Sequence, residues 1–396
     1  MHPASRLAIA VLLPALIMGV GAPARADAPL DQPPVAPVAE AGLYKSDAGP
    51  MTVKTLDETW KDPARSRTIP VRIFLPTPST PGARDAPGAD APSAPAAGPA
   101  KFPVVVFSPG LGGSRINYGY FARHLASHGY IVLVLSHPGS DTAAALEWVR
   151  SHGGAPSGQR LAPNAEDDAP GGWLMSSTSN PDNLRELPRD VSFVLDRLPE
   201  HKTLGPIADT ARIGVAGHSF GAYTAMAIGG MTVDLPEPHG GKARSFRDAR
   251  VKAVLPMSPE GTGTMGIVEG AWKSFGVPVL FLTGTRDYGA GGRSASWRRQ
   301  AFEAIRGVDA FLVTLQDAGH MTFGTPNGRA LRGASDKGER HEALIDSLGV
   351  AFFDAYLRAD ARARQFMQKF AMPKRAECIA EFRPAASQPD EPGPGK

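Results

Sequence analysis

The five residues Gly217-His-Ser-Phe-Gly221 constrain the fold more than any other part of the chain. They follow the apolar run 213–216 and precede a helix-forming stretch at 222–228. A serine between two glycines in a strand–turn–helix context is typical of the nucleophile of a serine hydrolase. The turn is tight and strained, and small residues beside it let the backbone close without side-chain clashes. Ser219 is therefore the candidate nucleophile.

The remaining pattern predicts an α/β fold: a mostly parallel central sheet, flanked by helices and joined by right-handed crossovers. Short apolar runs are typical of strands buried on both faces, and an earlier run that alternates apolar and polar residues predicts an antiparallel strand. We expect strands at 69–75, 104–107, 131–135, 251–257, 277–283 and 310–316, and helices at 118–127, 187–198 and 342–370. They predict a single domain over residues 43–383.

The N-terminus predicts a cleavable signal peptide over residues 1–26. Arg6 precedes an apolar stretch of about 14 residues, shorter than the roughly 20 that span a bilayer. Ala24-Arg-Ala26 then provides a cleavage site with small residues. We expect an exported protein, periplasmic or secreted, with no stable membrane anchor after cleavage.

Several segments are rich in Pro, Gly, Ala or polar residues and are expected to be irregular. They are a flexible N-terminal segment at 27–42, a flexible loop at 77–102, an insertion at 142–185 and a disordered tail at 384–396.

Charge and cysteine content exclude several function classes. Removal of Arg6 and Arg25 with the signal peptide lowers the net charge from +3 by 2 to +1, and no basic block stands out, which argues against nucleic-acid binding. The single cysteine, Cys378, excludes an intramolecular disulfide and lies far from any motif. No metal or cofactor site is expected, because the acidic residues 166–168 lack calcium-ligand spacing and no phosphate-binding glycine loop is present.

A serine nucleophile needs a base, an acid that orients the base, and donors for an oxyanion. In this fold the order is Ser, acid, His, with the acid and the histidine after later strands. Asp287 ends one predicted strand region and His320 follows the last predicted strand. Glu260, after the strand at 251–257, is the alternate acid.

One oxyanion donor is expected from the N–H of Phe220, directly after the nucleophile. The other is expected from the glycine-rich turn after the strand at 104–107, with Leu111 as first choice and Gly110 as alternate. His218 is interpreted as a packing residue whose side chain points away from the serine. For His137, a pocket-lining role and a structural role both remain open.

With these residues in place, the chain resembles the platelet-activating-factor acetylhydrolase and dienelactone-hydrolase-like branch of the α/β-hydrolases. The resemblance is carried by residues 67–76, 102–113, 125–132, 189–196 and 217–221. It implies a Ser-Asp-His hydrolase of carboxylic esters without a cofactor, acting on short-acyl phospholipid esters, lactones or other small esters. Pro109 stands where this branch usually has a histidine, and the acid at Asp287 follows the dienelactone-hydrolase pattern.

We therefore predict an exported serine esterase whose partner is a small-molecule ester or a lipid. A serine peptidase and a lipase with a lid built from residues 142–185 are alternatives within the same fold. A non-catalytic binding protein is a third alternative from another class. The sequence leaves the oligomeric state and the acyl-chain preference open.

Overall fold

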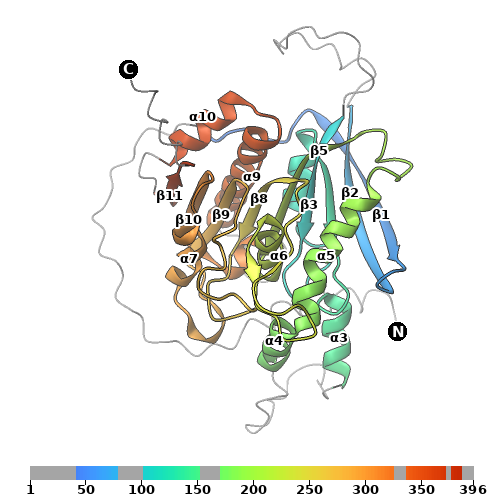
Figure 1. Cartoon of the computed structure of the whole chain (residues 1–396). Coiled ribbons are helices and arrows are strands. Elements are labelled where there is room, and N and C mark those ends of the chain that lie inside the picture. Colours follow the sequence, from blue (N-terminus) through green and yellow to red (C-terminus); the bar gives the residue numbers. More distant parts are fainter. Residues whose placement is uncertain (1–41, 79–100, 152–169, 325–335, 372–375, 386–396) are drawn as a thin grey trace, which may run out of the picture.

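The computed structural model describes residues 42–78, 101–151, 170–324, 336–371 and 376–385. The predicted signal peptide, residues 27–41, 79–100, 166–168 and 386–396 lie outside the described residues. Within the described part, a nine-stranded sheet has helices on both faces (Figure 1).

The strand order of this sheet is β1-β2-β4-β3-β5-β8-β9-β10-β11. The strands are β1 (Met51–Asp62), β2 (Arg67–Pro78), β3 (Phe102–Ser108), β4 (Ile131–Leu135), β5 (Ala208–His218), β8 (Val251–Met257), β9 (Val279–Arg286), β10 (Ala310–Gly319) and β11 (Cys378–Arg383). Every pairing from β4 to β10 is parallel, whereas β1–β2, β2–β4 and β10–β11 are antiparallel. The α/β fold with a mostly parallel sheet is confirmed.

The helices and short elements connect these strands. They are α2 (Gly119–Ser127), α3 (Thr142–Ser151), α4 (Pro170–Ser179), α5 (Pro181–Arg197), α6 (Phe220–Gly229), β6 (Thr232–Val233), β7 (Arg244–Ser245), η2 (Ala290–Gly292), η3 (Ala295–Arg299), α7 (Gln300–Ala304), η4 (His320–Phe323), α9 (Asp336–Leu357) and α10 (Ala361–Phe370).

The central strands are apolar on both faces because each face has its own core. In β3, Val104 and Val106 belong to the core shared with α5 and α6, while Val105 and Phe107 belong to the core shared with α2 and α9. In Figure 1, α5 and α6 lie in front of the sheet and α9 behind it. This two-sided burial explains why the predicted strands read as continuous apolar runs.

The prediction of a single C-terminal helix over 342–370 is wrong, because the helix is interrupted between α9 and α10. Ala359 lies in the left-handed region at φ 55°, which a continuous helix cannot accommodate. The side chain of Asp360 then accepts a hydrogen bond from the N–H of Ala363 and caps the new helix.

The expectation of an irregular insertion at 142–185 is also wrong for its described parts, which contain α3, α4 and the first turn of α5. The helix expected at 187–198 begins earlier, at Pro181. Asn180 accepts a hydrogen bond from the N–H of Asp182, and proline is favoured at the first helical position. The pair Asn180-Pro181 is a helix-start signal that the sequence itself contains, and it marks the start of α5.

An unexpected edge strand, β11, closes the sheet beside β10. Its Phe382 stacks on Phe311 of β10, with ring centroids 4.4 Å apart. Cys378, the first residue of β11, is buried, so the segment near the tail contributes to the core.

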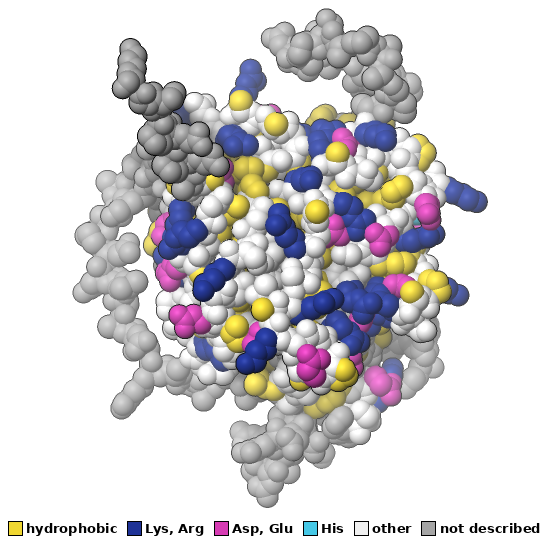
Figure 2. Space-filling model, viewed as in Figure 1, with side chains coloured by type: hydrophobic (Ala, Val, Ile, Leu, Met, Phe, Trp, Pro, Cys, Tyr) yellow, Lys and Arg dark blue, Asp and Glu magenta, His cyan; other side chains and the backbone are white. Residues whose placement is uncertain are grey.

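The face of the molecule that carries α5 and α6 has mixed charge. Figure 2 shows Lys and Arg side chains spread over it with Asp and Glu among them, and hydrophobic atoms in small separate areas. None of the helices in the ranges given above is both long and apolar enough to cross a membrane.

Candidate active site

Ser219 lies in the turn between β5 and α6, with backbone angles φ 54° and ψ −121°. This conformation is strained for a residue with a side chain and lifts the hydroxyl out of the sheet. The flanking glycines are required sterically. A Cβ on Gly217 would lie 2.1 Å from the carbonyl oxygen of Gly221, and a Cβ on Gly221 would lie 1.8 Å from that of Ser108. The local sequence therefore permits this turn only with glycine at both positions.

The structure brings Ser219, His320 and Asp287 together, and we call these three residues the Ser219 triad. The Nε2 atom of His320 lies 2.9 Å from the Oγ atom of Ser219. Its Nδ1 atom lies 2.9 Å from Oδ1 of Asp287. The two partners come from neighbouring parallel strands, since Asp287 follows β9 and His320 follows β10. The three groups therefore meet at the carboxyl edge of the sheet.

Asp287 is fully buried and ionised. Burial would raise the pKa of its carboxyl group, but the hydrogen bond from His320 and the charge of Arg298 outweigh this and lower the pKa to about 2. The hydroxyl of Thr283 donates to its Oδ2 atom at 3.0 Å. An ionised carboxylate only accepts hydrogen bonds, so Nδ1 of His320 carries the proton and Nε2 is free to accept one from Ser219.

His320 is poised as a neutral base. Burial lowers the pKa of its imidazole below the ordinary 6.5, and the charge of Arg298 adds to this, while Asp287 opposes it. The ring is therefore neutral at pH 7, with its one proton on Nδ1.

Glu260, the alternate acid, is not hydrogen-bonded to His320 in the described structure. It is buried, and its Oε2 atom has no hydrogen-bond partner among the described residues. Burial raises the pKa of its carboxyl group to about 8, against the opposing charge of Arg298. A carboxyl group that is neutral at pH 7 cannot stabilise an imidazolium as an ionised one does.

Among the described residues, the backbone N–H groups of Leu111 and Phe220 take part in no hydrogen bond. In the turn after β3, the N–H of Gly110 donates to the hydroxyl of Tyr118, that of Gly112 to the carbonyl of Ser140, and that of Gly113 to the carbonyl of Gly110. Within the described residues, no hydrogen bond uses the N–H of Leu111. Of the two donors expected in this turn, the N–H of Gly110 is thus already occupied, and Leu111 remains the candidate.

The other free donor is the N–H of Phe220, the first residue of α6. The first N–H groups of a helix have no intrahelical partner and form the positive end of the helix dipole. No hydrogen bond of the described chain occupies this group. The N–H groups of both residues expected as oxyanion donors are therefore without a hydrogen-bond partner among the described residues.

Arg298, which was not predicted from the sequence, holds the loop after β9 that contains Asp287, and we call this loop the acid loop. Its side chain is 3% exposed, and its Nε atom lies 2.8 Å from Oδ1 of Asp287 and donates to the carbonyl of the same residue at 2.9 Å. Its other nitrogens donate to the carbonyls of Ser258, Pro259 and Tyr288. No sequence signal singles it out, because its partners come from loops after two different strands.

Arg298 also approaches the base itself. Its Nη2 atom lies 2.9 Å from Nδ1 of His320. Because that nitrogen donates its proton to Asp287, it cannot accept one from Arg298 at the same time. The approach therefore brings two donors together and disfavours the charged imidazolium, in line with the lowered pKa of His320.

His218 does more than fill space. Its ring does not contact Ser219 through a hydrogen bond, but its Nδ1 atom lies 3.0 Å from the hydroxyl of Tyr118 and its Nε2 atom lies 2.9 Å from the carbonyl of His320. The carbonyl of His320 only accepts, so Nε2 of His218 donates to it, and Nδ1 of the neutral ring accepts from the Tyr118 hydroxyl. These hydrogen bonds connect the turn 109–113, which we call the oxyanion turn, to the backbone of His320.

His137 is buried at 3% exposure and hydrogen-bonded to Ser108 and Asp190, so the structural interpretation holds for it.

Comparison with known proteins identifies relatives of part of the chain. Residues 89–161 match the family described as platelet-activating factor acetylhydrolase, isoform II. The platelet-activating factor acetylhydrolase of Cavia porcellus is 29% identical over 143 residues, which cover 31% of this chain and 31% of that protein. The enzyme of the same name from Canis lupus familiaris is 28% identical over 140 residues, covering 32% and 31%.

Among solved structures, a ferulic acid esterase from Streptomyces cinnamoneus has a TM-score of 0.49 and 23% identity, covering 78% of this chain and 91% of that one. The present chain spans about a third of the length of the acetylhydrolases it matches. These matches show that part of the chain resembles the platelet-activating factor acetylhydrolases, and the sheet has the mostly parallel α/β topology expected from the sequence.

Proposed function

We propose that this chain hydrolyses carboxylic esters through an acyl-enzyme formed on Ser219. The observation that carries the proposal is the hydrogen-bonded series from Ser219 to His320 to Asp287, with 2.9 Å at each contact, on a strained strand-to-helix turn. The similarity to enzymes named platelet-activating factor acetylhydrolase agrees with this reaction class.

In the first half-reaction, the Ser219 hydroxyl attacks the ester carbonyl and its proton moves to Nε2 of His320. Asp287 accepts the Nδ1 hydrogen bond and stabilises the imidazolium. The tetrahedral intermediate then collapses, the ester C–O bond breaks, and His320 returns the proton to the leaving alcohol. In the second half-reaction His320 takes a proton from water as the water oxygen attacks the acyl carbon. The bond between this carbon and Oγ of Ser219 then breaks, His320 returns the proton to Oγ, and the carboxylic acid leaves.

The N–H groups of Leu111 and Phe220 are proposed to stabilise the negative charge that develops on the carbonyl oxygen. Each such donor contributes on the order of 3–4 kcal/mol to transition-state stabilisation. Two fixed backbone donors need no reorganisation during the reaction. This is why a rigid turn is an advantage here.

The proposed substrates are small or short-acyl esters, with phospholipid acyl esters included. A serine peptidase or a lipase that uses the segment 142–185 as a lid would use the same groups, and both are outcomes of the test below. No cofactor or metal is needed for this mechanism.

Export belongs to the same proposal and rests on the N-terminal pattern of residues 1–26. Expression in a host with a general secretion pathway should yield mature protein that begins at Asp27. N-terminal sequencing tests this, and a retained Met1 in the secreted fraction would contradict it.

The function is tested with purified mature protein on p-nitrophenyl esters from acetate to palmitate, with Ser219→Ala as control. We expect turnover of the short esters and none in the variant, together with fluorophosphonate labelling that the variant lacks. Preference for palmitate would favour the lipase. Labelling without ester turnover would favour the peptidase, and absence of both would favour a binding protein.

A further inference from the structure

A second set of serine, histidine and aspartate lies in the interior, about one strand away from the first. We call Ser108, His137 and Asp190 the Ser108 triad. The Oγ atom of Ser108 lies 2.9 Å from Nε2 of His137, and Nδ1 of His137 lies 3.0 Å from Oδ2 of Asp190. Their exposures are 0%, 3% and 0%, so no substrate reaches them. The triad therefore needs an explanation other than chemistry on a substrate.

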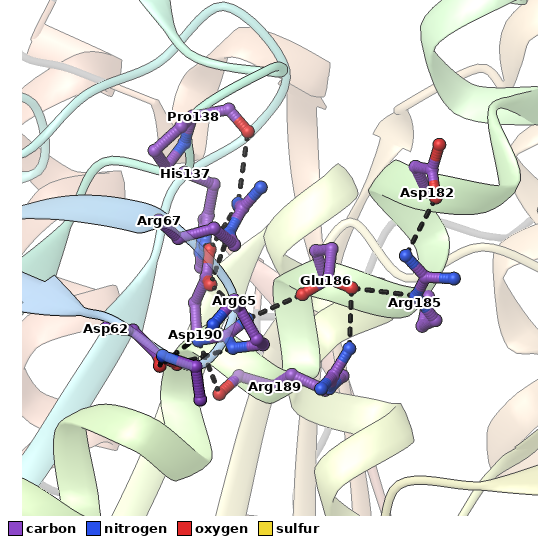
Figure 3. A network of polar contacts seen from close by, with 11 residues as sticks. Asp62, Arg65, Arg67, His137, Pro138, Asp182, Arg185, Glu186, Arg189 and Asp190 are labelled. Carbon is purple, nitrogen blue, oxygen red and sulfur yellow. Dashed lines mark hydrogen bonds and ion pairs between the residues drawn. The ribbon is translucent and has the colours of Figure 1, made fainter.

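Two arginines hold Asp190 in its ionised form. Arg67 donates from Nε to Oδ1 at 2.9 Å and from Nη2 to Oδ2 at 2.7 Å, and Arg65 donates from Nη1 to Oδ1 at 2.8 Å. Burial would raise the pKa of this carboxyl group, but the hydrogen bonds from His137 and Arg67 outweigh it and lower the pKa. Figure 3 shows both guanidinium groups directed at Asp190 from the strand side of α5.

Because the carboxylate only accepts, Nδ1 of His137 donates to Asp190 and Nε2 of the neutral ring accepts from the Ser108 hydroxyl. The next residue is held as well, since the carbonyl of Pro138 accepts from Nη2 of Arg67 at 3.1 Å (Figure 3). The loop after β4 is thus anchored to β2, β3 and α5 at once.

This anchored loop in turn holds the oxyanion turn. The carbonyl of Ser140 accepts from the N–H of Gly112 at 2.8 Å, and the hydroxyl of Thr142 donates to the carbonyl of Gly112 at 2.7 Å. On the other side, the N–H of Gly110 donates to Tyr118 at 3.0 Å. Leu111 therefore lies between two peptide groups whose orientations are both fixed by hydrogen bonds.

We propose that the Ser108 triad, with Arg67, positions the turn 109–113 so that the N–H of Leu111 faces the oxygen of the ester carbonyl group that Ser219 attacks. His137 is then a positioning residue. It holds Ser108, the last residue of β3 before the turn, and it anchors the loop that binds Gly112. The inference rests on the proposed esterase function, since Leu111 matters only if an oxyanion forms.

The helix α5 offers a matched pair of variants. Asp190 and Glu186 are four residues apart, both are buried carboxylates, and both bond to Arg65. Glu186 bonds otherwise only to Arg185 and Arg189 among the described residues and reaches no part of the oxyanion turn. Asp190→Asn removes the ionised acceptor for His137. Glu186→Gln disturbs the same ion network without touching His137, at a side chain that is also buried, with 8% exposure against 0% for Asp190.

We expect Asp190→Asn to lower kcat about tenfold with KM nearly unchanged, because a slightly displaced donor acts on the transition state and little on bound substrate. A trifluoromethyl ketone, which forms a tetrahedral oxyanion adduct with a serine, should lose affinity by the same factor as kcat/KM. Glu186→Gln should leave kcat and this inhibition constant unchanged, even where both variants lower the melting temperature equally.

Hydrogen exchange of the Gly112 amide provides a readout that does not depend on activity. We expect faster exchange in Asp190→Asn and wild-type exchange in Glu186→Gln. Ser108→Ala, nearly isosteric, serves if Asp190→Asn does not fold, and should show the same pattern with a smaller loss of kcat. Equal effects of the Asp190 and Glu186 variants on kcat, or unchanged exchange and kcat in a folded Asp190→Asn or Ser108→Ala, would overturn the inference. Wild-type protein that hydrolyses no ester would refute the proposed function alone, and the exchange data would still decide whether His137 orders the turn.

Discussion

The Ser219 triad and the Ser108 triad contain the same three residue types with nearly the same spacing. The serine–histidine contact is 2.9 Å in both, and the histidine–aspartate contact is 2.9 Å in the first and 3.0 Å in the second. Only their surroundings differ. Ser219 is 8% exposed on a turn with φ 54°, whereas Ser108 is fully buried at the regular end of β3, paired with Gly217.

The comparison teaches that the residue types alone do not make a catalytic site. The side chain of His320 is 15% exposed, so a substrate and a water molecule can reach it, whereas that of His137 is 2% exposed. Within the part of the chain that the structure describes, the N–H groups of Leu111 and Phe220, which we propose as the oxyanion donors for Ser219, have no hydrogen-bond partner. We propose that access, a lifted hydroxyl and oxyanion donors are what make the Ser219 triad reactive, whereas the Ser108 triad holds the fold.

The sharpest way to break this comparison is to delete each serine hydroxyl in turn. Ser219→Ala should lower kcat by about 10⁶-fold, because no nucleophile remains. Ser108→Ala should lower kcat tenfold or less, because only the position of a donor changes. Ester hydrolysis by both purified variants, with circular dichroism as the folding control, measures the difference. Losses of similar size would show that the two serines are not distinguished as we describe.

The next largest effect is expected at the acid of the Ser219 triad. Asp287→Asn keeps the shape but presents an amide that can hold the wrong imidazole tautomer, so kcat should decrease by about 10⁴-fold. The kcat of Asp190→Asn should decrease far less. Steady-state kinetics at pH 7 compares them, and a mild effect of Asp287→Asn would move the acid role to another group.

The two triads also differ in which of their members an arginine contacts, and substitution of Arg298 tests whether this difference matters. In the Ser108 triad the arginines contact only the acid, but Arg298 contacts both Asp287 and His320. Its charge lowers the pKa of His320, so its removal should raise that pKa. For Arg298→Met we expect kcat about tenfold lower and the acidic limb of kcat/KM at a pH about one unit higher.

Arg298→Lys is the matched control, because lysine keeps the charge and loses the planar set of contacts. It should lower kcat through the loosened acid loop and leave the acidic limb near that of wild type. Identical pH profiles for the methionine variant and wild type would show that Arg298 only braces the loop.

The Ser219 triad could be predicted from sequence because it follows from topology. Ser219, Asp287 and His320 each follow a parallel strand, and such strand ends meet at one edge of the sheet. The strands themselves were readable because their burial on both faces makes them continuous apolar runs. Leu111 was expected from the glycine-rich turn after the strand at 104–107, with Gly110 as alternate, and in the structure the N–H of Gly110 donates to the hydroxyl of Tyr118.

The Ser108 triad and Arg298 could not be predicted, because no pattern in the sequence links their members. Asp190 lies 53 positions from His137, and their contact depends on how α5 packs on the loop after β4. The interruption of the helix at Ala359 was not predicted either. Apolar residues continue at helical spacing on both sides of Ala359, and only its left-handed φ ends the helix. A local sequence pattern predicts the helices and strands. The side-chain contacts between them can be known only once their packing in three dimensions is known.

The smallest effect on activity is expected at Glu260, which is as deeply buried as the acids of both triads but has no ionised role. Its ordinary pKa is 4.5, and burial raises it to about 8. Between these values the folded protein binds one proton more than the unfolded chain. The stability that the neutral carboxyl provides is therefore complete below pH about 4.5 and is lost as pH rises through about 8. Glu260→Gln does not titrate, so the free energy of unfolding should fall less steeply across this window than in wild type, with kcat at pH 7 unchanged. Urea unfolding at several pH values compares the slopes, and a steep loss of kcat in Glu260→Gln would instead give Glu260 the role that we assign to Asp287.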